Sequence, residues 1–111
     1  MVQYAAPLDS AFAALSDPTR RGILEHLGRE DASISDLAAR FDMTLTGMKK
    51  HVGVLEQSGL VQTEKLGRVR TCRLGPRRLD RETAWIAKYQ QMLEARYNRL
   101  EAFLERTKGQ S

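Results

Sequence analysis

Residues 44–59 read TLTGMKKHVGVLEQSG, and this spacing predicts one helix with two different faces. Met48, Val52 and Leu55 recur at i, i+4 and i+7, which is the apolar stripe of a helix that packs on a core. The first residue of the stretch, a threonine, suits the N-cap, and the last, a glycine, suits the position beyond the final turn.

The face away from this stripe carries small, polar and cationic side chains near the N-terminal end of the helix. Such a face suits insertion into a DNA major groove. The alternative is an ordinary amphipathic helix with a solvated lysine pair. The residues of this stretch that we expect to contact DNA are Thr44, Thr46, Gly47, Lys49, Lys50 and His51.

A short helix is predicted just before this stretch, over residues 36–41, with Ser33 or Ser35 as its cap. Leu37 would face inward, and residues 42–44 form a three-residue turn. A short helix, a brief turn and a longer helix with small exposed residues at its start together indicate a helix-turn-helix.

Two further helices are expected upstream. Residues 8–15 read as a brief helix, and Asp17 is a candidate N-cap directly before a proline that begins the next helix. Arg20 and Arg21 lie in the first turn of that helix, where the helix dipole disfavours cations. We therefore expect them to pair with acids or to reach a phosphate, and a structural role is favoured. His26, beside the apolar stripe, is expected to be partly buried.

After residue 59 the hydrophobic period changes, and residues 60–66 and 69–74 predict two strands joined at a Gly-Arg turn. This hairpin is rich in cations. A basic hairpin directly after a helix-turn-helix is a wing, whose tip can follow the phosphate backbone or reach a minor groove. The alternative is a solvated edge hairpin. The wing residues expected to contact DNA are Lys65, Arg68 and Arg70.

The last predicted helix, residues 79–108, carries an apolar and aromatic stripe that a domain of this size cannot cover. We therefore expect a dimer interface shared with residues 1–15, the N-terminal arm and first helix. The alternative is a single-chain core helix with a frayed tail. The expected interface residues are Leu8, Phe12, Leu15, Trp85, Tyr89, Met92, Tyr97, Leu100 and Leu104.

The chain of 111 residues is long enough for one domain, so residues 1–111 are expected to form a single winged helix DNA-binding domain, mainly α with a small β-hairpin. The net charge is +4, and from residue 40 onward Lys and Arg outnumber Asp and Glu, which favours a polyanionic partner. Cys72 is the single cysteine, so one chain cannot form an internal disulfide. No stretch predicts a membrane span or signal peptide, and we expect a cytoplasmic protein.

Four segments together resemble the ArsR/SmtB-type winged helix repressors: ALSDPTRRGIL, ISDLAARFDM, TLTGMKKHVGVLEQSGLV and GRVRTCRL. The likeness covers about residues 9–74, and the long last helix resembles that of one subgroup. The resemblance implies a homodimeric DNA-binding transcriptional regulator, usually a repressor, whose first and last helices make the dimer.

The family's familiar metal-sensing positions are not filled here by metal ligands. Where some members carry a Cys-x-Cys pair this chain has Ser33 and Ser35, and no histidine follows His51. Serine hydroxyls are poor ligands for soft metals. We expect no metal and no cofactor. An alternative is an effector- or metal-responsive regulator whose site, using His26, His51 or the N-terminal arm, is not recognisable from the family motifs.

The expected function is a sequence-specific regulator, most simply a repressor, that binds an inverted-repeat operator as a homodimer. Its partners would be double-stranded DNA, a second copy of the chain and possible unknown effectors. The family often has a small residue where Lys49 stands, so Lys49 is expected to contact a guanine edge or a phosphate. A winged dimer that binds only proteins is an alternative. An enzyme is not expected, because no nucleophile, base and orienting group are grouped in the sequence.

Overall fold

The structure is a computed structural model that describes residues 6–109. The chain divides into two compact units, Met1–Arg78 and Leu79–Ser111. Of the expected N-terminal arm, residues 1–5 lie outside the described residues, and the first helix begins at Ala6.

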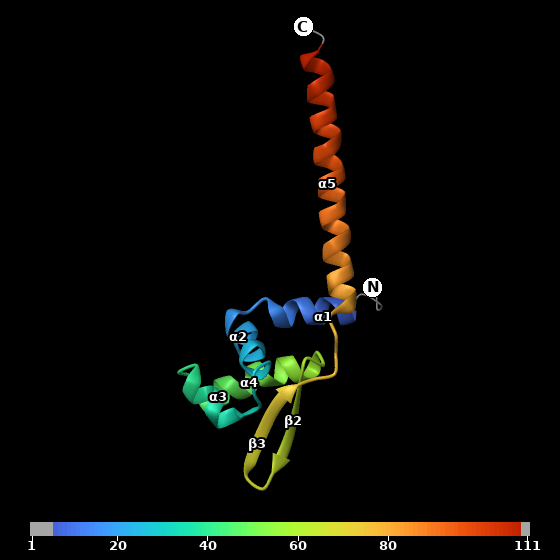
Figure 1. Ribbon diagram of the computed structural model, residues 1–111. Coiled ribbons are helices and arrows are strands. Elements are labelled where there is room, and N and C mark those ends of the chain that lie inside the picture. Colours follow the sequence, from blue (N-terminus) through green and yellow to red (C-terminus); the bar gives the residue numbers. More distant parts are fainter. Residues whose placement is uncertain (1–5, 110–111) are drawn as a thin grey trace. The chain divides into compact units, whose positions relative to one another are not determined.

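The first unit contains a helix-turn-helix followed by a β-hairpin, and the second contains one long helix (Figure 1). This arrangement confirms the predicted fold class. In chain order the elements are α1 (Ala6–Leu15), α2 (Pro18–Leu27), β1 (Ala32–Ser33), α3 (Ile34–Arg40), α4 (Leu45–Gln57), β2 (Val61–Leu66), β3 (Val69–Leu74) and α5 (Asp80–Lys108).

A short strand, β1, was not expected from the sequence, which indicated only a polar connection at this point. It pairs antiparallel with β3, placing Ala32 opposite Cys72 and Ser33 opposite Thr71, so the sheet has the order β1-β3-β2. Two residues are too few to show the alternation of apolar and polar side chains that marks a strand. The pairing also depends on a partner strand some forty positions along the chain. Ser33 also caps α3, which therefore begins at Ile34, two residues earlier than predicted.

The core of the first unit lies where α2, α3 and α4 pack against one another and against the sheet. The predicted stripe of α4 is confirmed, because Met48, Val52 and Leu55 are all buried. They are joined by side chains from the other elements, including Ile23 of α2 and Leu37 of α3. The buried face of α4 thus fixes which of its residues remain outside.

The helices α3 and α4 end with the same backbone motif. After α3 the N–H of Met43 donates to the carbonyl of Ala38 at 2.9 Å, and an equivalent bond closes the end of α4. The residue that reverses the chain has a positive φ in each case, 53° at Asp42 and 81° at Gly59. Glycine adopts this region freely, and aspartate is among the few other residue types that visit it. The three-residue turn predicted between the helices therefore depends on Asp42.

The base of the hairpin is closed by contact between two glycines. The N–H of Gly75 donates to the carbonyl of Leu60 at 2.8 Å, and a Cβ on Gly75 would overlap the carbonyl oxygen of Gly59. At the other end the predicted turn is confirmed, with a φ of 64° at Gly67 between the paired residues Leu66 and Val69. The positive φ at the first central residue suits a tight two-residue hairpin turn.

Candidate nucleic-acid interface

The N-terminal half of α4 presents the exposed face that the sequence predicted. Thr44 caps the helix, its Oγ1 accepting the backbone N–H of Gly47 at 3.0 Å. Thr46, Lys49 and Lys50 are exposed, whereas Gly47 is only half-buried beneath the cap. The cap leaves other N–H groups of the first turn free to meet an anion, as the positive end of a helix dipole favours.

Lys49 lies in a groove that runs between α4 and the wing. One part of this groove, with a volume of about 320 Å³, brings Lys49 together with three wing cations from the predicted set, which are Lys65, Arg68 and Arg70. All four side chains are exposed. Four exposed cations that line one groove make a favourable site for an anionic partner such as a phosphate backbone. We name this the basic groove.

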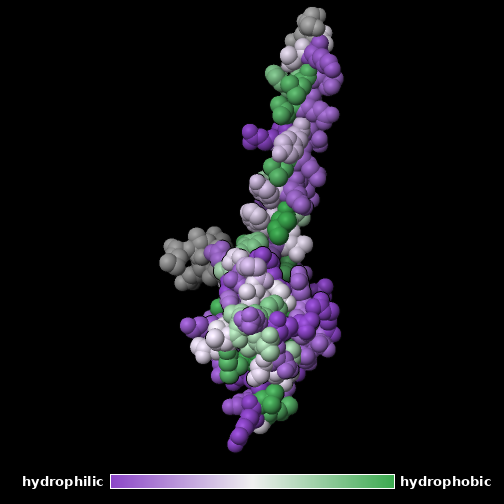
Figure 2. All heavy atoms as spheres, turned by 90° about the vertical axis from the view of Figure 1, so that its left-hand side faces the viewer, coloured by the Kyte–Doolittle hydropathy of each residue, from purple (hydrophilic) through white to green (hydrophobic). Residues whose placement is uncertain are grey.

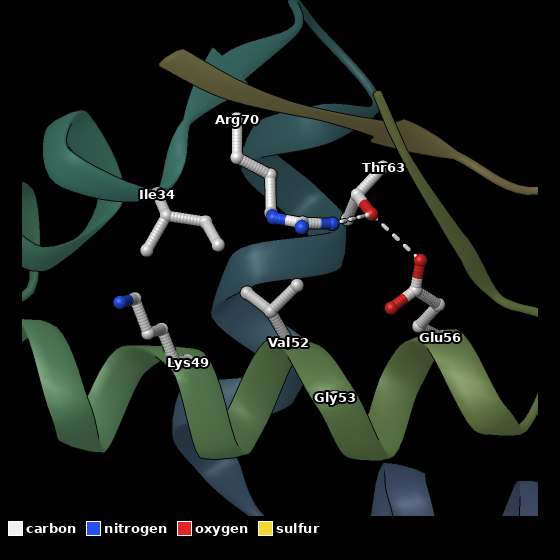
Figure 3. A pocket seen from close by; sticks show the side chains of 7 residues that line it. All are labelled: Ile34, Lys49, Val52, Gly53, Glu56, Thr63 and Arg70. Atoms are coloured by element: carbon white, nitrogen blue, oxygen red, sulfur yellow. Dashed lines mark hydrogen bonds between the residues drawn. The ribbon is translucent and has the colours of Figure 1, made fainter. Parts of the chain in front are cut away.

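The adjoining part of the groove, of about 380 Å³, lies between α4 and the hairpin (Figure 3). Here Thr63 donates its hydroxyl hydrogen to Oε2 of Glu56 at 2.7 Å and accepts a hydrogen bond from Nη1 of Arg70 at 2.9 Å. Glu56 and Thr63 were not among the residues predicted from the sequence. The alternation of side chains along a strand could have indicated Thr63, because residues two positions apart share a face and Lys65 was already predicted to contact DNA.

His51 lies apart from this groove, although it was predicted with the other residues of α4. Its Nδ1 is 3.3 Å from Nη1 of Arg20 and 3.9 Å from the carboxylate of Asp17. Asp17 also caps α2 by accepting the backbone N–H of Arg20 at 3.0 Å. That hydrogen bond holds the pKa of Asp17 below its ordinary value, and the nearby charges of His51 and Arg20 lower it further.

The hydrogen bonds of Arg20 and Arg21 go mainly to backbone carbonyls, although Arg20 also lies close enough to Asp17 for its charge to lower the pKa of that acid. Arg20 donates from Nε to the carbonyl of Ala14 at 2.8 Å and from Nη2 to that of Ala13 at 3.0 Å. Arg21 donates to the carbonyl of Leu15 at 2.8 Å. The last carbonyls of a helix lack intrahelical partners and carry partial negative charge, so α1 itself supplies the acceptors. The structural role that the sequence favoured is confirmed.

Comparison with known proteins identifies the family. A family profile described as a helix-turn-helix domain matches residues 15–64. A solved structure of an ArsR family transcriptional regulator is 45% identical, with a TM-score of 0.74, covering 85% of this chain and 97% of that one.

The chain belongs to the ArsR family of transcriptional regulators. An ArsR-like transcriptional regulator from Rhodococcus sp. RHA1 is 35% identical with a TM-score of 0.64, covering 100% of this chain and 98% of that one. The transcriptional repressor SdpR of Bacillus subtilis is 32% identical over 60 residues, which are 54% of this chain and 67% of SdpR. The protein is therefore a transcriptional regulator with a helix-turn-helix DNA-binding domain.

Ser33, one of the two serines considered in the sequence as replacements for metal ligands, has a structural role. The hydroxyl of Ser33 accepts the backbone N–H of Asp36 at 3.0 Å and so caps α3. Among residues 6–109, no three His, Cys, Asp or Glu side chains are grouped as a metal site would require. Cys72 is buried, and burial raises the pKa of its thiol to about 11. His26, expected to be partly buried, is 6% exposed.

The residues predicted for the dimer interface differ in exposure. Leu8, Phe12 and Leu15 of α1 are half-buried. On α5 the predicted residues are each about half exposed, and Figure 2 shows hydrophobic residues along one side of this helix and hydrophilic residues along the other. Trp85 and Tyr89 stack with ring centroids 5.7 Å apart.

None of the described helices combines the length and the hydropathy that a bilayer span demands.

Proposed function

We propose that this ArsR family member is a homodimeric repressor that acts in the cytoplasm by binding an inverted-repeat operator. The observation that supports this proposal is the basic groove, in which Lys49 of α4 and the wing cations Lys65, Arg68 and Arg70 line one surface. Side chains on the first turns of α4 would read base edges in a major groove. The wing would bind the adjoining phosphates.

Selection of bound DNA from a random pool tests this proposal directly. A two-fold symmetric dimer should select an inverted repeat with half-sites about one helical turn, or a small multiple of it, apart. If the purified protein enriches no symmetric motif above its non-specific binding, the proposal fails.

The wing is tested by the salt dependence of binding. Each phosphate contact adds about 0.9 to the slope of log affinity against log salt concentration, and a dimer contains two wings. We expect Arg68→Ala to make this slope shallower by about 1.8 units and to weaken all DNA sequences alike. Arg73→Ala is the matched control, because Arg73 pairs with Glu64 at 3.3 Å on the opposite face of the hairpin. Equal slopes for the two variants would remove the wing from the DNA interface.

Lys49 is proposed to read sequence. Its side chain is exposed and lies at the α4 side of the basic groove. If it contacts a guanine edge, Lys49→Ala should relax base preference at one position of each half-site, with a loss of discrimination of about 1–3 kcal/mol. Lys49→Ala with unchanged affinity and unchanged base preference would refute this role.

The dimer is proposed to form through residues 1–15 and 79–108, with the apolar side of α5 covered by a second copy. Leu100 is 53% exposed, so placing a charge there should separate the protomers without a large cost to the monomer. Asn98 is exposed on the opposite side of α5, about 160° around the helix, and provides the matched control. Sedimentation should report a monomer for Leu100→Glu and a dimer for Asn98→Glu. Dimers in both variants would exclude this side of α5 from the interface.

A further inference from the structure

A chain of three side chains connects the recognition helix α4 to both strands of the wing. Glu56 of α4 accepts the hydroxyl hydrogen of Thr63 of β2 at 2.7 Å, and the same hydroxyl oxygen accepts Nη1 of Arg70 of β3 at 2.9 Å. Figure 3 shows the three groups in line across the groove. A hydroxyl can donate one hydrogen bond while accepting another, so Thr63 is the necessary middle member.

The three hydrogen-bonded side chains lie at the point in the hairpin where the buried residues end and the exposed residues begin. Cys72, opposite Thr63 in the register, is fully buried, whereas every residue from Lys65 to Arg70 is exposed. Thr63 itself is half-buried. The outer half of the hairpin therefore lacks a hydrophobic anchor, and an isolated two-stranded hairpin is only marginally stable in water.

The negative charge of Glu56 is a second reason to assign this group of three side chains a positioning role. It is an exposed acid on the helix that is proposed to approach a polyanion, so its direct electrostatic effect on DNA binding is unfavourable. Its carboxylate, however, fixes the hydroxyl that holds Arg70, and Arg70 keeps other N–H donors for a phosphate. An orienting role for these three hydrogen-bonded side chains would explain why an acid and a hydroxyl occupy these two positions.

We propose that Glu56, Thr63 and Arg70 form a brace of positioning residues that sets the wing against α4, so that Lys65 and Arg68 line up with Lys49 in the basic groove. This proposal rests on the proposed DNA binding. The brace acts before DNA arrives: it holds the wing in the conformation that binds, so the ordering entropy is not lost at the moment of association.

Thr63→Val provides the cleanest test, because it removes the hydroxyl and changes neither the charge nor the β-branched shape. We expect operator affinity to fall about three- to tenfold, as the loss of one or two hydrogen bonds predicts. The salt slope should stay unchanged, because no phosphate contact is removed. Thr63→Ser keeps the hydroxyl and should restore affinity to the wild-type value.

Glu56→Met tests the sign of the effect, because methionine removes both the negative charge and the oxygen that accepts the Thr63 hydroxyl. Simple electrostatics predicts that removing a negative charge tightens binding to DNA, whereas the brace predicts weaker binding. Tighter binding by Glu56→Met, or wild-type affinity in Thr63→Val, would overturn the proposal.

A measurement on the free protein separates the brace from the proposed function. Residual dipolar couplings of wing amides relative to those of α4 should report a changed or broadened wing orientation in Thr63→Val and the wild-type orientation in Thr63→Ser. Unchanged couplings in Thr63→Val would refute the brace even if DNA binding is confirmed. A wild-type protein without sequence-specific binding would refute the proposed function, whereas the couplings would still decide whether the three residues set the wing.

Discussion

Arg20 joins three parts of the first unit, and its removal should be costly. Its guanidinium donates to two carbonyls at the end of α1 and approaches Nδ1 of His51 on α4. A hydrogen bond from a charged donor contributes about 1.5–3 kcal/mol when buried and less when exposed. One of the two carbonyl bonds is part-buried and the other is exposed, so we expect Arg20→Met to lower the free energy of unfolding by about 2 kcal/mol.

Arg21→Met is the matched control. Both arginines lie near the start of α2, so any relief of the unfavourable helix dipole should be similar in the two variants. Methionine keeps the apolar stem and a similar helix propensity at both positions. Arg21 donates one exposed hydrogen bond, to Leu15, and its loss should cost about 0.5 kcal/mol.

Urea unfolding followed by circular dichroism, at one fixed protein concentration, measures this difference. The gap between the variants, about 1.5 kcal/mol, corresponds to a midpoint lower by roughly 6–12 °C in a thermal melt of a small domain. A fixed concentration is needed because association with a second copy would add to the apparent stability. Equal unfolding free energies for Arg20→Met and Arg21→Met would refute the reasoning, because the additional bonds of Arg20 would then contribute nothing.

Three further measurements test local features. Gly53→Ala should raise the free energy of unfolding by about 0.5–1 kcal/mol, because the added Cβ would meet open space. Gly22→Ala should lower it, because the added Cβ would lie 2.8 Å from the ring of Phe41. Stabilisation by both substitutions would contradict this reasoning. Because burial raises the pKa of Cys72 to about 11, its alkylation at pH 8 should be slow when folded and fast in denaturant, and equal rates would show that the thiol is accessible. The lowered pKa of Asp17 gives stability that is present above its unfolded pKa of about 3.9 and is lost as the pH falls through the folded pKa, so Asp17→Asn should flatten the acid-unfolding profile, and an unchanged profile would refute this.

Local features of the fold could be predicted because each depends on nearby residues. The burial of Met48, Val52 and Leu55 follows from helical spacing alone. The caps at Asp17 and Thr44 follow from a short polar side chain three positions before a free backbone N–H. These predictions needed no knowledge of which elements meet in space.

Features that join distant segments could not be predicted in the same way. Strand β1 exists only through its pairing with β3. The acceptors of Arg20 are backbone carbonyls, and because every residue has one, no residue type in the sequence indicates which of them accept. The proximity of His51 to Asp17, which belongs to another helix, likewise has no signal in the local sequence. The brace escaped prediction because its middle member is an ordinary strand threonine.

The contact between Gly59 and Gly75 fixes where the hairpin begins and where it ends. The chain enters and leaves the hairpin where these two backbones meet, and the N–H of Gly75 closes that junction on Leu60. Residues added or removed in pairs between Lys65 and Arg70 would lengthen or shorten the hairpin tip while Val61 and Cys72 stay in the core and the brace stays intact. The reach of the wing that is proposed to bind DNA could therefore be changed separately from α4.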